Sequence, residues 1–335
     1  MFTSRPALDR AGTVLRDAVA AAIAAPSTHN TQPWRFRIAG AGLALFGDPR
    51  RRLPVIDPDG RQLVQSCGCA FYNARVAVRA AGYVDEISVT TSLDLSQPLA
   101  ELRLGPPRAA TSEDHALMQG VALRRTNRRP FLDRPVGDAH LQPMLAAAAS
   151  EGALAIRLTP PHKHALGALI DEADHQQYAA PAFRDEIAAW LVPSVSRRRD
   201  GIPFVEKEYG SALPFGVMRT LRSPHLAEQF GERERQLVDG APVVLALGTA
   251  GDTPADWFAS GQALEAVLIR AASLGLSAAF LNQVLEVGEL RERTAALLGL
   301  QGYPQMLIRL GFPEAPLHRA APRRDLRDVL EIAEP

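Results

Sequence analysis

"APSTHNTQPW", residues 25–34, joins an alanine-rich segment to Arg35-Phe36-Arg37-Ile38. Pro26 predicts the end of a helix over residues 8–25, and the bulky and charged residues that alternate from Trp34 predict a strand. The two prolines stiffen the intervening loop, and its Ser, Thr, Asn and Gln side chains can each donate and accept hydrogen bonds. Such a loop suits either local capping of the helix end or the edge of a planar heterocycle.

The composition is that of a globular protein long enough to bury a sizeable core. Hydrophobic residues make up 47% of the 335 residues, and 37 basic residues balance 37 acidic ones. This balance gives no indication of a nucleic-acid or membrane-surface partner. Only Lys163 and Lys207 are lysines, so a fixed cationic site must consist mainly of guanidinium groups, which suit bidentate oxyanion binding.

The first helix is preceded by arginines and contains an alanine run, as a signal peptide does. Asp9 and Asp17 interrupt this pattern, and no apolar run is long enough to span a bilayer. We therefore expect an ordinary first helix and a cytoplasmic protein. Cys67 and Cys69 are too few for a structural zinc site, and we expect them to be small apolar residues on a packed helix. The scattered histidines predict no metal site.

Outward from the opening loop, hydrophobic periodicity predicts two series of helices and strands. The first series has strands over 43–46, 87–91 and 99–104 and a helix over 67–81. The second has helices over 113–124, 140–149, 164–178 and 261–274, and strands over 153–158, 243–247, 278–281 and 306–310. Residues 179–236 contain five spread prolines and are expected to be irregular.

The two series resemble each other. Gly68 and Gly82 bracket one predicted helix, and Gly261 and Gly275 bracket another at the same spacing, so that each helix is expected to begin at the first glycine of its pair. A strand follows each helix. The chain therefore reads as two copies of one α+β unit, residues 1–110 and 111–335, with an insertion at about 178–236 in the second.

A second polar stretch, Arg124-Arg125-Thr126-Asn127-Arg128-Arg129-Pro130-Phe131, ends the helix over 113–124. Guanidinium groups beside a hydroxyl suit a phosphate, although a solvated basic turn has the same pattern. A further arginine group, Arg319, Arg323 and Arg324, follows a G-F-P turn and read alone would be an exposed tail. No P-loop, dinucleotide fingerprint or nucleophile elbow is present.

Together these motifs resemble those of the nitroreductase family of flavoproteins, and more closely its mycobacterial Acg-type, two-copy branch. Pro26, Ser27, Asn30, Gln32, Pro33 and Trp34 match the P-S-x-x-N-x-Q-P-W loop, which is similar to the family's flavin-edge loop. Arg124, Thr126, Arg128, Phe131, Pro135 and Val136 resemble its phosphate and ribityl motif. The run Ala271–Ser277 resembles its A-x-x-L-G-L-x-S helix end, after which the chain approaches the flavin N5.

The resemblance implies a nitroreductase-like α+β fold in which two fused copies form an internal pseudo-dimer of antiparallel or mixed sheets flanked by helices. It implies FMN as the cofactor and NAD(P)H as an electron donor, with the chemistry at the flavin and no catalytic side chain. The residues that it implies for the FMN site are Pro26, Ser27, Thr28, Asn30, Gln32, Arg124, Arg125, Thr126, Asn127, Arg128, Leu281, Asn282, Gln283, Arg319, Arg323 and Arg324.

Because the loop occurs only in the first half and the arginine motif only in the second, we expect one FMN per chain, and a monomer can form the whole site. Three functions stay open at this point. One is NAD(P)H-dependent reduction of nitroaromatic or quinone-like acceptors. Another is FMN sequestration beneath a lid at about 178–236, as in the two-copy branch. The third is an α+β protein without a cofactor.

Overall fold

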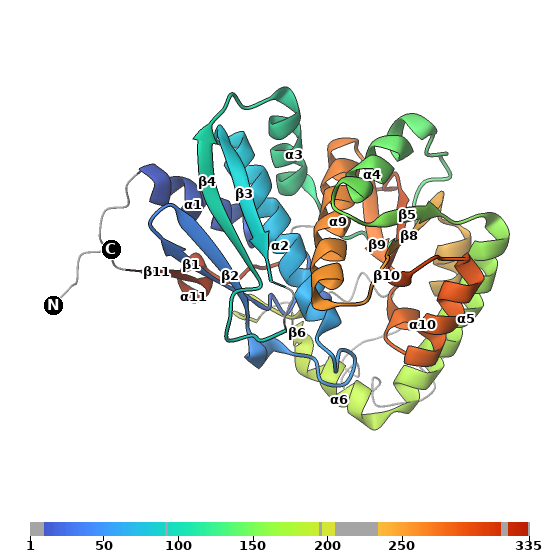
Figure 1. Cartoon of the computed structure of the whole chain (residues 1–335). Helices are drawn as coiled ribbons and strands as arrows, with labels where there is room; N and C mark the ends of the chain where they lie inside the picture. Colours follow the sequence, from blue (N-terminus) through green and yellow to red (C-terminus); the bar gives the residue numbers. More distant parts are fainter. Residues whose placement is uncertain (1–9, 91–92, 194–195, 205–233, 316–320, 334–335) are drawn as a thin grey trace.

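The computed structural model describes residues 10–90, 93–193, 196–204, 234–315 and 321–333. Its first half contains helix α1 (Arg10–Ala22) and helix α2 (Arg61–Ala80) beside a five-stranded sheet (Figure 1). The sheet order is β11-β1-β2-β4-β3, and its strands are β1 (Trp34–Ala39), β2 (Gly42–Gly47), β3 (Tyr83–Val89), β4 (Ala100–Pro107) and β11 (Leu330–Ile332). Neighbouring strands are antiparallel, except that β11 runs parallel to β1 and so returns the end of the chain to the first sheet.

The second half has a four-stranded antiparallel sheet in the order β5-β8-β10-β9. Its strands are β5 (Leu154–Arg157), β8 (Val243–Thr249), β9 (Ser277–Phe280) and β10 (Tyr303–Gly311). Its helices are α3 (Ser112–Leu123), α4 (Asp138–Ser150), α5 (Pro160–Ala179), α9 (Pro254–Ser273) and α10 (Gly288–Leu298). The α+β fold class expected from the sequence is confirmed.

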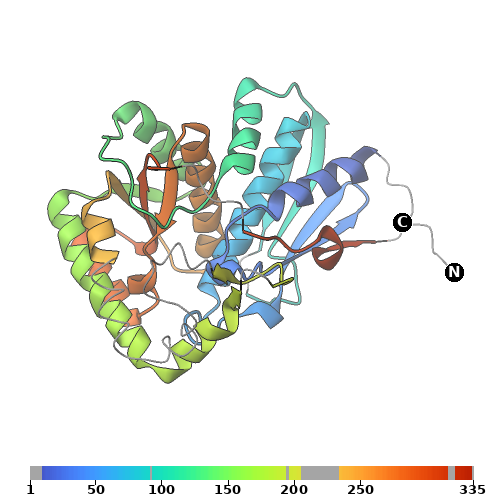
Figure 2. The same ribbon diagram turned by 180° about the vertical axis from the view of Figure 1, so that it is seen from behind.

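Helices α2 and α9 lie side by side between the two sheets, as Figures 1 and 2 both show. Both are buried along most of their length because each packs against a sheet and against the other helix. Gly68 and Gly261 meet at this crossing: an ideal Cβ on Gly68 would lie 2.4 Å from the Phe258 carbonyl oxygen, and one on Gly261 would lie 2.1 Å from that of Gln65. The paired glycines therefore allow two helix backbones to touch.

This arrangement corrects the predicted helix starts. We expected the two helices to begin at Gly68 and Gly261, but α2 begins at Arg61 and α9 at Pro254. The helix start of α9 has a capping box between Thr253 and Asp256, with Pro254 in the first turn, a stronger start signal than a glycine. These two glycines allow close packing within the helices and do not start them.

Residues 179–236 were expected to be irregular, and this prediction is wrong for the part that the structure describes. Helix α6 (Pro181–Trp190) leads into a two-stranded parallel sheet of β6 (Leu191–Pro193) and β7 (Ile202–Phe204), and residues 234–239 are helical. Pro181 occupies the first turn of α6, where a missing N–H costs nothing, so it starts a helix instead of breaking one. Residues 205–233 lie outside the described part.

Cys67 and Cys69 are free and buried on α2, as the sequence predicted. Within the described residues, no helix is both long and apolar enough to cross a bilayer. The same residues contain no cluster of three or more potential metal ligands.

Candidate functional site

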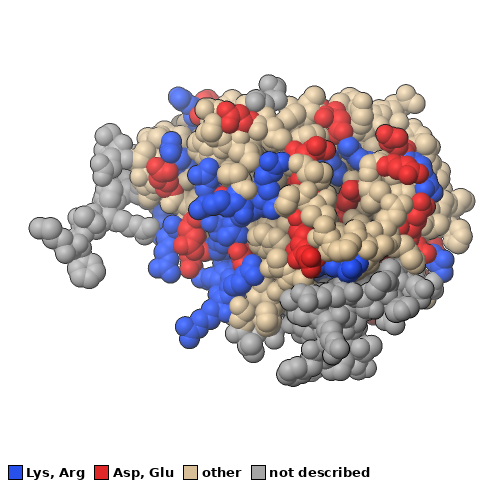
Figure 3. Space-filling model, turned by 90° about the horizontal axis from the view of Figure 1, so that it is seen from below, with Lys and Arg blue, Asp and Glu red and all other residues tan. Residues whose placement is uncertain are grey.

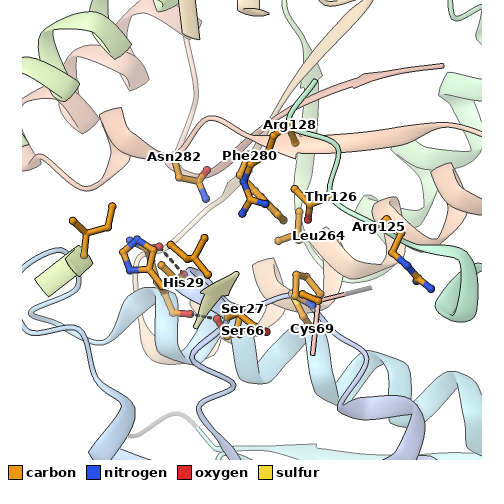
Figure 4. Close-up of a pocket in the computed structure, with 18 of the residues that line it drawn as sticks. Ser27, His29, Ser66, Cys69, Arg125, Thr126, Arg128, Leu264, Phe280 and Asn282 are labelled. Carbon is orange, nitrogen blue, oxygen red and sulfur yellow. Dashed lines mark hydrogen bonds between the residues drawn. The ribbon is translucent and has the colours of Figure 1, made fainter. Parts of the chain in front are cut away.

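A cavity of about 1240 Å³ lies where the two halves meet. The opening loop, α2 and the end of α3 line it, together with the segment after β9, helix α5 and residues 321–323. Figure 4 shows Ser27, His29 and Ser66 on one side of the open space, with Phe280, Asn282 and Arg128 on the other. Elements from both halves are therefore needed to enclose it.

The opening loop has a strained backbone. His29, Asn30 and Gln32 have φ values of 51°, 54° and 51°, in the left-handed region that side-chain-bearing residues avoid. Each costs about 1–3 kcal/mol unless neighbouring groups hold it. The Ser27 hydroxyl supports the loop from within, because it accepts a 2.9 Å hydrogen bond from the Gln32 backbone N–H. A strained backbone at a cavity wall is typical of binding sites.

The C-terminal arginine pair supports the same loop from outside. Arg323 donates to the Asn30 side-chain oxygen at 3.0 Å, and it also lines the cavity. The backbone N–H of Arg324 donates to Gln32 Oε1 at 2.8 Å, and its guanidinium donates to the Gln32 carbonyl at 3.1 Å. Arg324 does not line the cavity, so its contribution is to hold the loop in place.

The predicted phosphate motif sits at the end of α3. Arg309 on β10 fixes its backbone, because it donates to the carbonyls of Asn127 at 3.2 Å and Arg129 at 3.0 Å. The Asn127 side chain points away from the cavity and donates to Ser277 Oγ at 3.3 Å. Arg124 and Arg128 both line the cavity, and Arg128 belongs to this fixed segment.

Cationic groups dominate this end of the cavity. Burial, and then the charge of Arg124, lower the pKa of Arg323 to about 9. Burial, and then the charge of Arg128, lower the pKa of His29 to about 4, so that its imidazole is neutral at pH 7. Like charges this close in a buried space call for an anion between them.

Two of these guanidiniums have unused donors. The Nε atoms of Arg124 and Arg323 are both buried without a hydrogen-bond partner. Glu265 on α9 lies 3.7 Å from Arg124 Nε, too far for a good hydrogen bond, and both of its carboxyl oxygens are also unpartnered. Burial raises the pKa of Glu265 to about 7. The cluster is therefore incompletely satisfied, as expected for a site that a ligand completes.

Asn282, which the resemblance placed near the flavin N5, lies across the cavity from His29 (Figure 4). Its side-chain oxygen accepts from the Leu307 backbone N–H at 3.0 Å, and its Nδ2 lies 3.0 Å from Met306 Sδ. These contacts assign the amide orientation, so the Asn282 side chain is fixed and not free to rotate.

A strap over the opening loop, residues 196–202, belongs to the predicted lid region. The Gln32 side chain donates to the Arg199 carbonyl at 2.7 Å, and that of Asn30 donates to the Gly201 carbonyl at 3.0 Å. Asp200 forms an ion pair with Arg51 at 2.8 Å. The strap contributes Ser196, Arg197, Arg198, Arg199 and Ile202 to the cavity wall.

Most of the predicted site residues come together in this cavity. Those that line it are Pro26, Ser27, Thr28, Asn30, Arg124, Arg125, Thr126, Arg128, Asn282, Gln283 and Arg323. Gln32, Asn127, Leu281 and Arg324 do not, since Leu281 is in the core and the other three make the internal contacts given above. Arg319 lies outside the described residues.

Sequence reasoning missed several residues of the cavity wall, among them His29, Gln62, Asp174, Gln177 and Glu286. The sequence identifies a polar loop here but does not indicate that His29 and Asn30 adopt left-handed backbone conformations. Asp174 and Gln177 lie on α5, where a polar helix face is usually solvated. Only the contact between α5 and the rest of the second half turns this face inward.

In the view from below, Lys and Arg gather towards the left of the molecule, and Asp and Glu are interspersed among them and spread over the rest of this face (Figure 3). The cavity wall also contains both charges, with arginines in the motif and at residue 323 and carboxyl groups on α5 and beside η4 (Gln283–Leu285).

Comparisons with known proteins identify the family of the chain. The family model described as "Nitroreductase family" matches residues 121–312. The Mycobacterium tuberculosis H37Rv protein named "Putative NAD(P)H nitroreductase Rv3131" is 29% identical over 327 residues, covering 96% of this chain and 92% of that protein. "Putative NAD(P)H nitroreductase acg" from the same strain is 28% identical over 331 residues, covering 95% and 96%. Among solved structures, a nitroreductase with bound FMN from Desulfitobacterium hafniense is 14% identical, with a TM-score of 0.40, over 65% of this chain and 98% of that one.

The matched segment covers more than half of the chain and includes the whole arginine motif, β9 and β10. The chain belongs to the nitroreductase family, and by family it is an oxidoreductase.

Proposed function

We propose that this chain binds FMN and uses NAD(P)H to reduce nitroaromatic or quinone-like acceptors. The observation that carries the proposal is the cluster of buried arginines with unused donors at one end of the cavity, where Arg124 and Arg323 face each other. The names of its mycobacterial relatives, which include NAD(P)H nitroreductase, support the same reaction.

The residues present fit FMN. Arg124, Arg128 and Arg323 would hold the phosphate, because all three line the cavity and the buried Nε atoms of Arg124 and Arg323 have unused donors. Ser27 and Asn30, on the strained loop, would meet the edge of the ring system. The cavity has room for the cofactor and an aromatic acceptor together. When bound, FMN supplies the two-electron redox chemistry between donor and acceptor.

The protein's own contribution is then binding, orientation and exclusion of water. Neutral His29 presents an uncharged hydrogen-bonding group in a buried wall, and its Nδ1 has no partner within the described part of the chain. Asn282 presents a side chain fixed by Leu307, and the strap is hydrogen-bonded to the loop and lines the cavity. No side chain in this arrangement is required to act as a nucleophile.

We also propose that residues 1–110 and 111–335 are two copies of one unit that form an internal pseudo-dimer with one FMN per chain. The opening loop comes from the first unit and the arginine motif from the second, and the two central helices meet through equivalent glycines, Gly68 and Gly261. A monomer would then contain a complete site.

A second function, FMN sequestration with little turnover, is favoured by the strap. Three side-chain contacts, from Gln32, Asn30 and Arg51, fasten the strap to the first half. If residues 178–236 act as a lid that stays closed, NAD(P)H would be excluded from bound flavin. Flavin that dithionite reduces and NADPH does not would distinguish this function from the first.

Titration of flavin-free protein with FMN tests the cofactor assignment. We expect saturation at one FMN per chain. The double variant Arg124→Ala/Arg128→Ala should weaken binding by about 100-fold or more, because each charge-assisted hydrogen bond contributes roughly 1.5–3 kcal/mol. The control, Arg103→Ala/Arg157→Ala, removes two exposed arginines from β4 and β5 and should bind as the wild type does. Unchanged affinity in the first variant would refute the phosphate assignment.

A further inference from the structure

The acidic part of the cavity wall is formed by α5 and the residues beside η4. Glu286 is held there by two amides: Gln177 Nε2 donates at 2.7 Å and Gln62 Nε2 at 3.1 Å. Gln62 in turn accepts a 2.8 Å hydrogen bond from the Thr28 hydroxyl. The Glu286 carboxyl is therefore fixed in place and connected to the opening loop.

Asp174 lies on α5 and lines the same end of the cavity. Asp174 is only 3% exposed, and its Oδ2 has no hydrogen-bond partner within the described part of the chain. A buried carboxyl oxygen without a donor is costly, and because Asp174 lines a cavity, a ligand there can supply the donor.

The charged groups that act on Asp174 are all acidic: Glu234, Glu286 and Asp171. Burial, and then these charges, raise the pKa of Asp174 to about 8. Glu286 is raised to a pKa of about 7, first by burial, although Arg61 acts in the opposite direction. The Arg61 guanidinium donates to the carbonyls of Leu285 and Gln305, behind the cavity wall.

The aromatic wall beside these carboxyls suits a flat ligand. Tyr178 and Phe183 pack edge to face with centroids 5.2 Å apart, and both line the cavity with Ile187. Aromatic and aliphatic walls favour an aromatic ring, while the unpartnered carboxyl oxygen favours a nitrogen that donates hydrogen bonds.

We propose that Asp174 and Glu286 form a subsite for a protonated nitrogen, so that the preferred acceptor is an aromatic compound carrying an ammonium or amidinium group. This inference rests on the proposed function, because the same cavity holds the reaction. The cation would supply the donor that Asp174 Oδ2 lacks and would offset the repulsion among the three neighbouring carboxyls.

Binding of a cation at this subsite displaces a proton. At pH 7 the unliganded Asp174 is protonated, since its pKa lies above the solution pH. A bound ammonium favours the carboxylate, so the proton leaves to solvent as the cation binds. Glu234, Asp171 and Glu286 act on the Asp174 carboxyl, and Asp57 and Arg61 act on Glu286. Because these groups are coupled, the measured proton release is that of the whole group and not of Asp174 alone.

The test compares two probes of nearly equal size, 4-nitrobenzylamine, which is an ammonium at neutral pH, and 4-nitrobenzyl alcohol, which is neutral. Calorimetric titration of FMN-loaded protein without a reductant measures both affinities. We expect the amine to bind about tenfold more tightly, as a buried charge pair allows. Titration in two buffers of different ionisation enthalpy should show that the amine, and not the alcohol, releases protons.

Asp174→Asn is the decisive variant, since it keeps the shape of the side chain and removes the charge. Its affinity ratio for the two probes should fall to about one. Glu172→Gln is the control. The Glu172 carboxyl lies on the same helix but pairs with Arg293 outside the cavity, so this variant should keep the wild-type affinity ratio. Equal affinities in the wild type, or a ratio that survives Asp174→Asn, would overturn the proposal.

A separate measurement, reduction of the neutral probe by NADPH, tests the proposed function. Reduction of the neutral alcohol probe by NADPH depends on bound FMN and does not depend on the cation subsite. A protein that reduces the alcohol but shows no preference for the amine would retain the proposed function and lose this inference. A protein that binds no FMN would lose the function, and its probe preference can still be measured.

Discussion

His29 illustrates how a single side chain acquires its properties from residues that are distant in sequence. Its backbone lies in the left-handed region, its Nδ1 is buried without a partner, and Arg128 from the other half faces it. The sequence predicted a polar loop with two stiffening prolines, and Pro26, Ser27, Thr28 and Asn30 do line the cavity. It could not predict that His29 joins them, because the burial that mainly lowers its pKa, and the Arg128 charge that adds to this effect, arise only in the folded chain.

The lowered pKa of His29 predicts a pH dependence of stability. The folded pKa of about 4 lies below the ordinary pKa of 6.5 that His29 has in the unfolded chain. The unfolded state therefore binds more protons between these values, and stability is lost as the pH falls from 6.5 towards 4. The wild type should lose up to about 3 kcal/mol relative to His29→Gln over this interval, at 1.36 kcal/mol per pKa unit. Urea unfolding of both proteins at a series of pH values checks this, and parallel pH curves would contradict it.

Gln32 marks the limit of motif reading at the residue scale. The motif places it among the cofactor contacts, whereas its side chain is turned to the Arg199 carbonyl and the Arg324 backbone N–H. Both partners come from other segments of the chain, and the motif alone does not predict that they hold the Gln32 side chain. A motif identifies the loop, but the tertiary contacts decide which side chains face the cavity.

At the scale of elements, the crossing of α2 and α9 depends on two glycines that the sequence analysis found but misinterpreted. Gly68 and Gly261 occupy equivalent places in the two series, and this similarity led to the expectation that they begin their helices. They lie inside the helices because the close approach of two backbones needs a residue without a Cβ, and single-sequence periodicity carries no information on which helix faces which.

Gly261→Ala should therefore destabilise the fold. Its Cβ would lie 2.1 Å from the Gln65 carbonyl oxygen, which belongs to a helix backbone and can move only if the whole helix moves. Overpacking of this kind costs about 1–3 kcal/mol, more than the helix propensity gained from alanine. Gly288→Ala is the matched control, because an added Cβ there meets nothing within 4 Å. Urea unfolding should show a loss of about 2 kcal/mol for Gly261→Ala and none for Gly288→Ala; equal stability of the two variants would exclude a tight crossing.

At the scale of the whole molecule, the α+β fold class could be predicted because it follows from local patterns of helix and strand. The return of β11 to the first sheet could not, since three residues at the end of a chain carry too little pattern to specify a partner. The acidic part of the cavity could not be predicted either, because Asp174 and Glu286 are far apart in sequence and the polar helix face that carries Asp174 is of a kind that is usually exposed.

The polarity of the cavity is likewise a property of the assembled molecule. The arginine end takes Arg124 and Arg128 from the motif and Arg323 from the returning chain end, and the acidic end takes Asp174 from α5. The motif arginines were evident as a phosphate-binding pattern. The unused Nε donors of Arg124 and Arg323, on which the proposed phosphate site rests, were evident only from the three-dimensional arrangement.

The central claim is that this chain turns over as an FMN-dependent oxidoreductase, and anaerobic stopped-flow mixing of the FMN-loaded protein with NADPH tests it most directly. The account predicts that the flavin absorbance band is bleached within seconds, in proportion to one FMN per chain, and that it returns when a nitroaromatic acceptor is added. Flavin that stays oxidised for minutes in excess NADPH or NADH, yet is reduced at once by dithionite, would contradict the claim and leave FMN sequestration as the function.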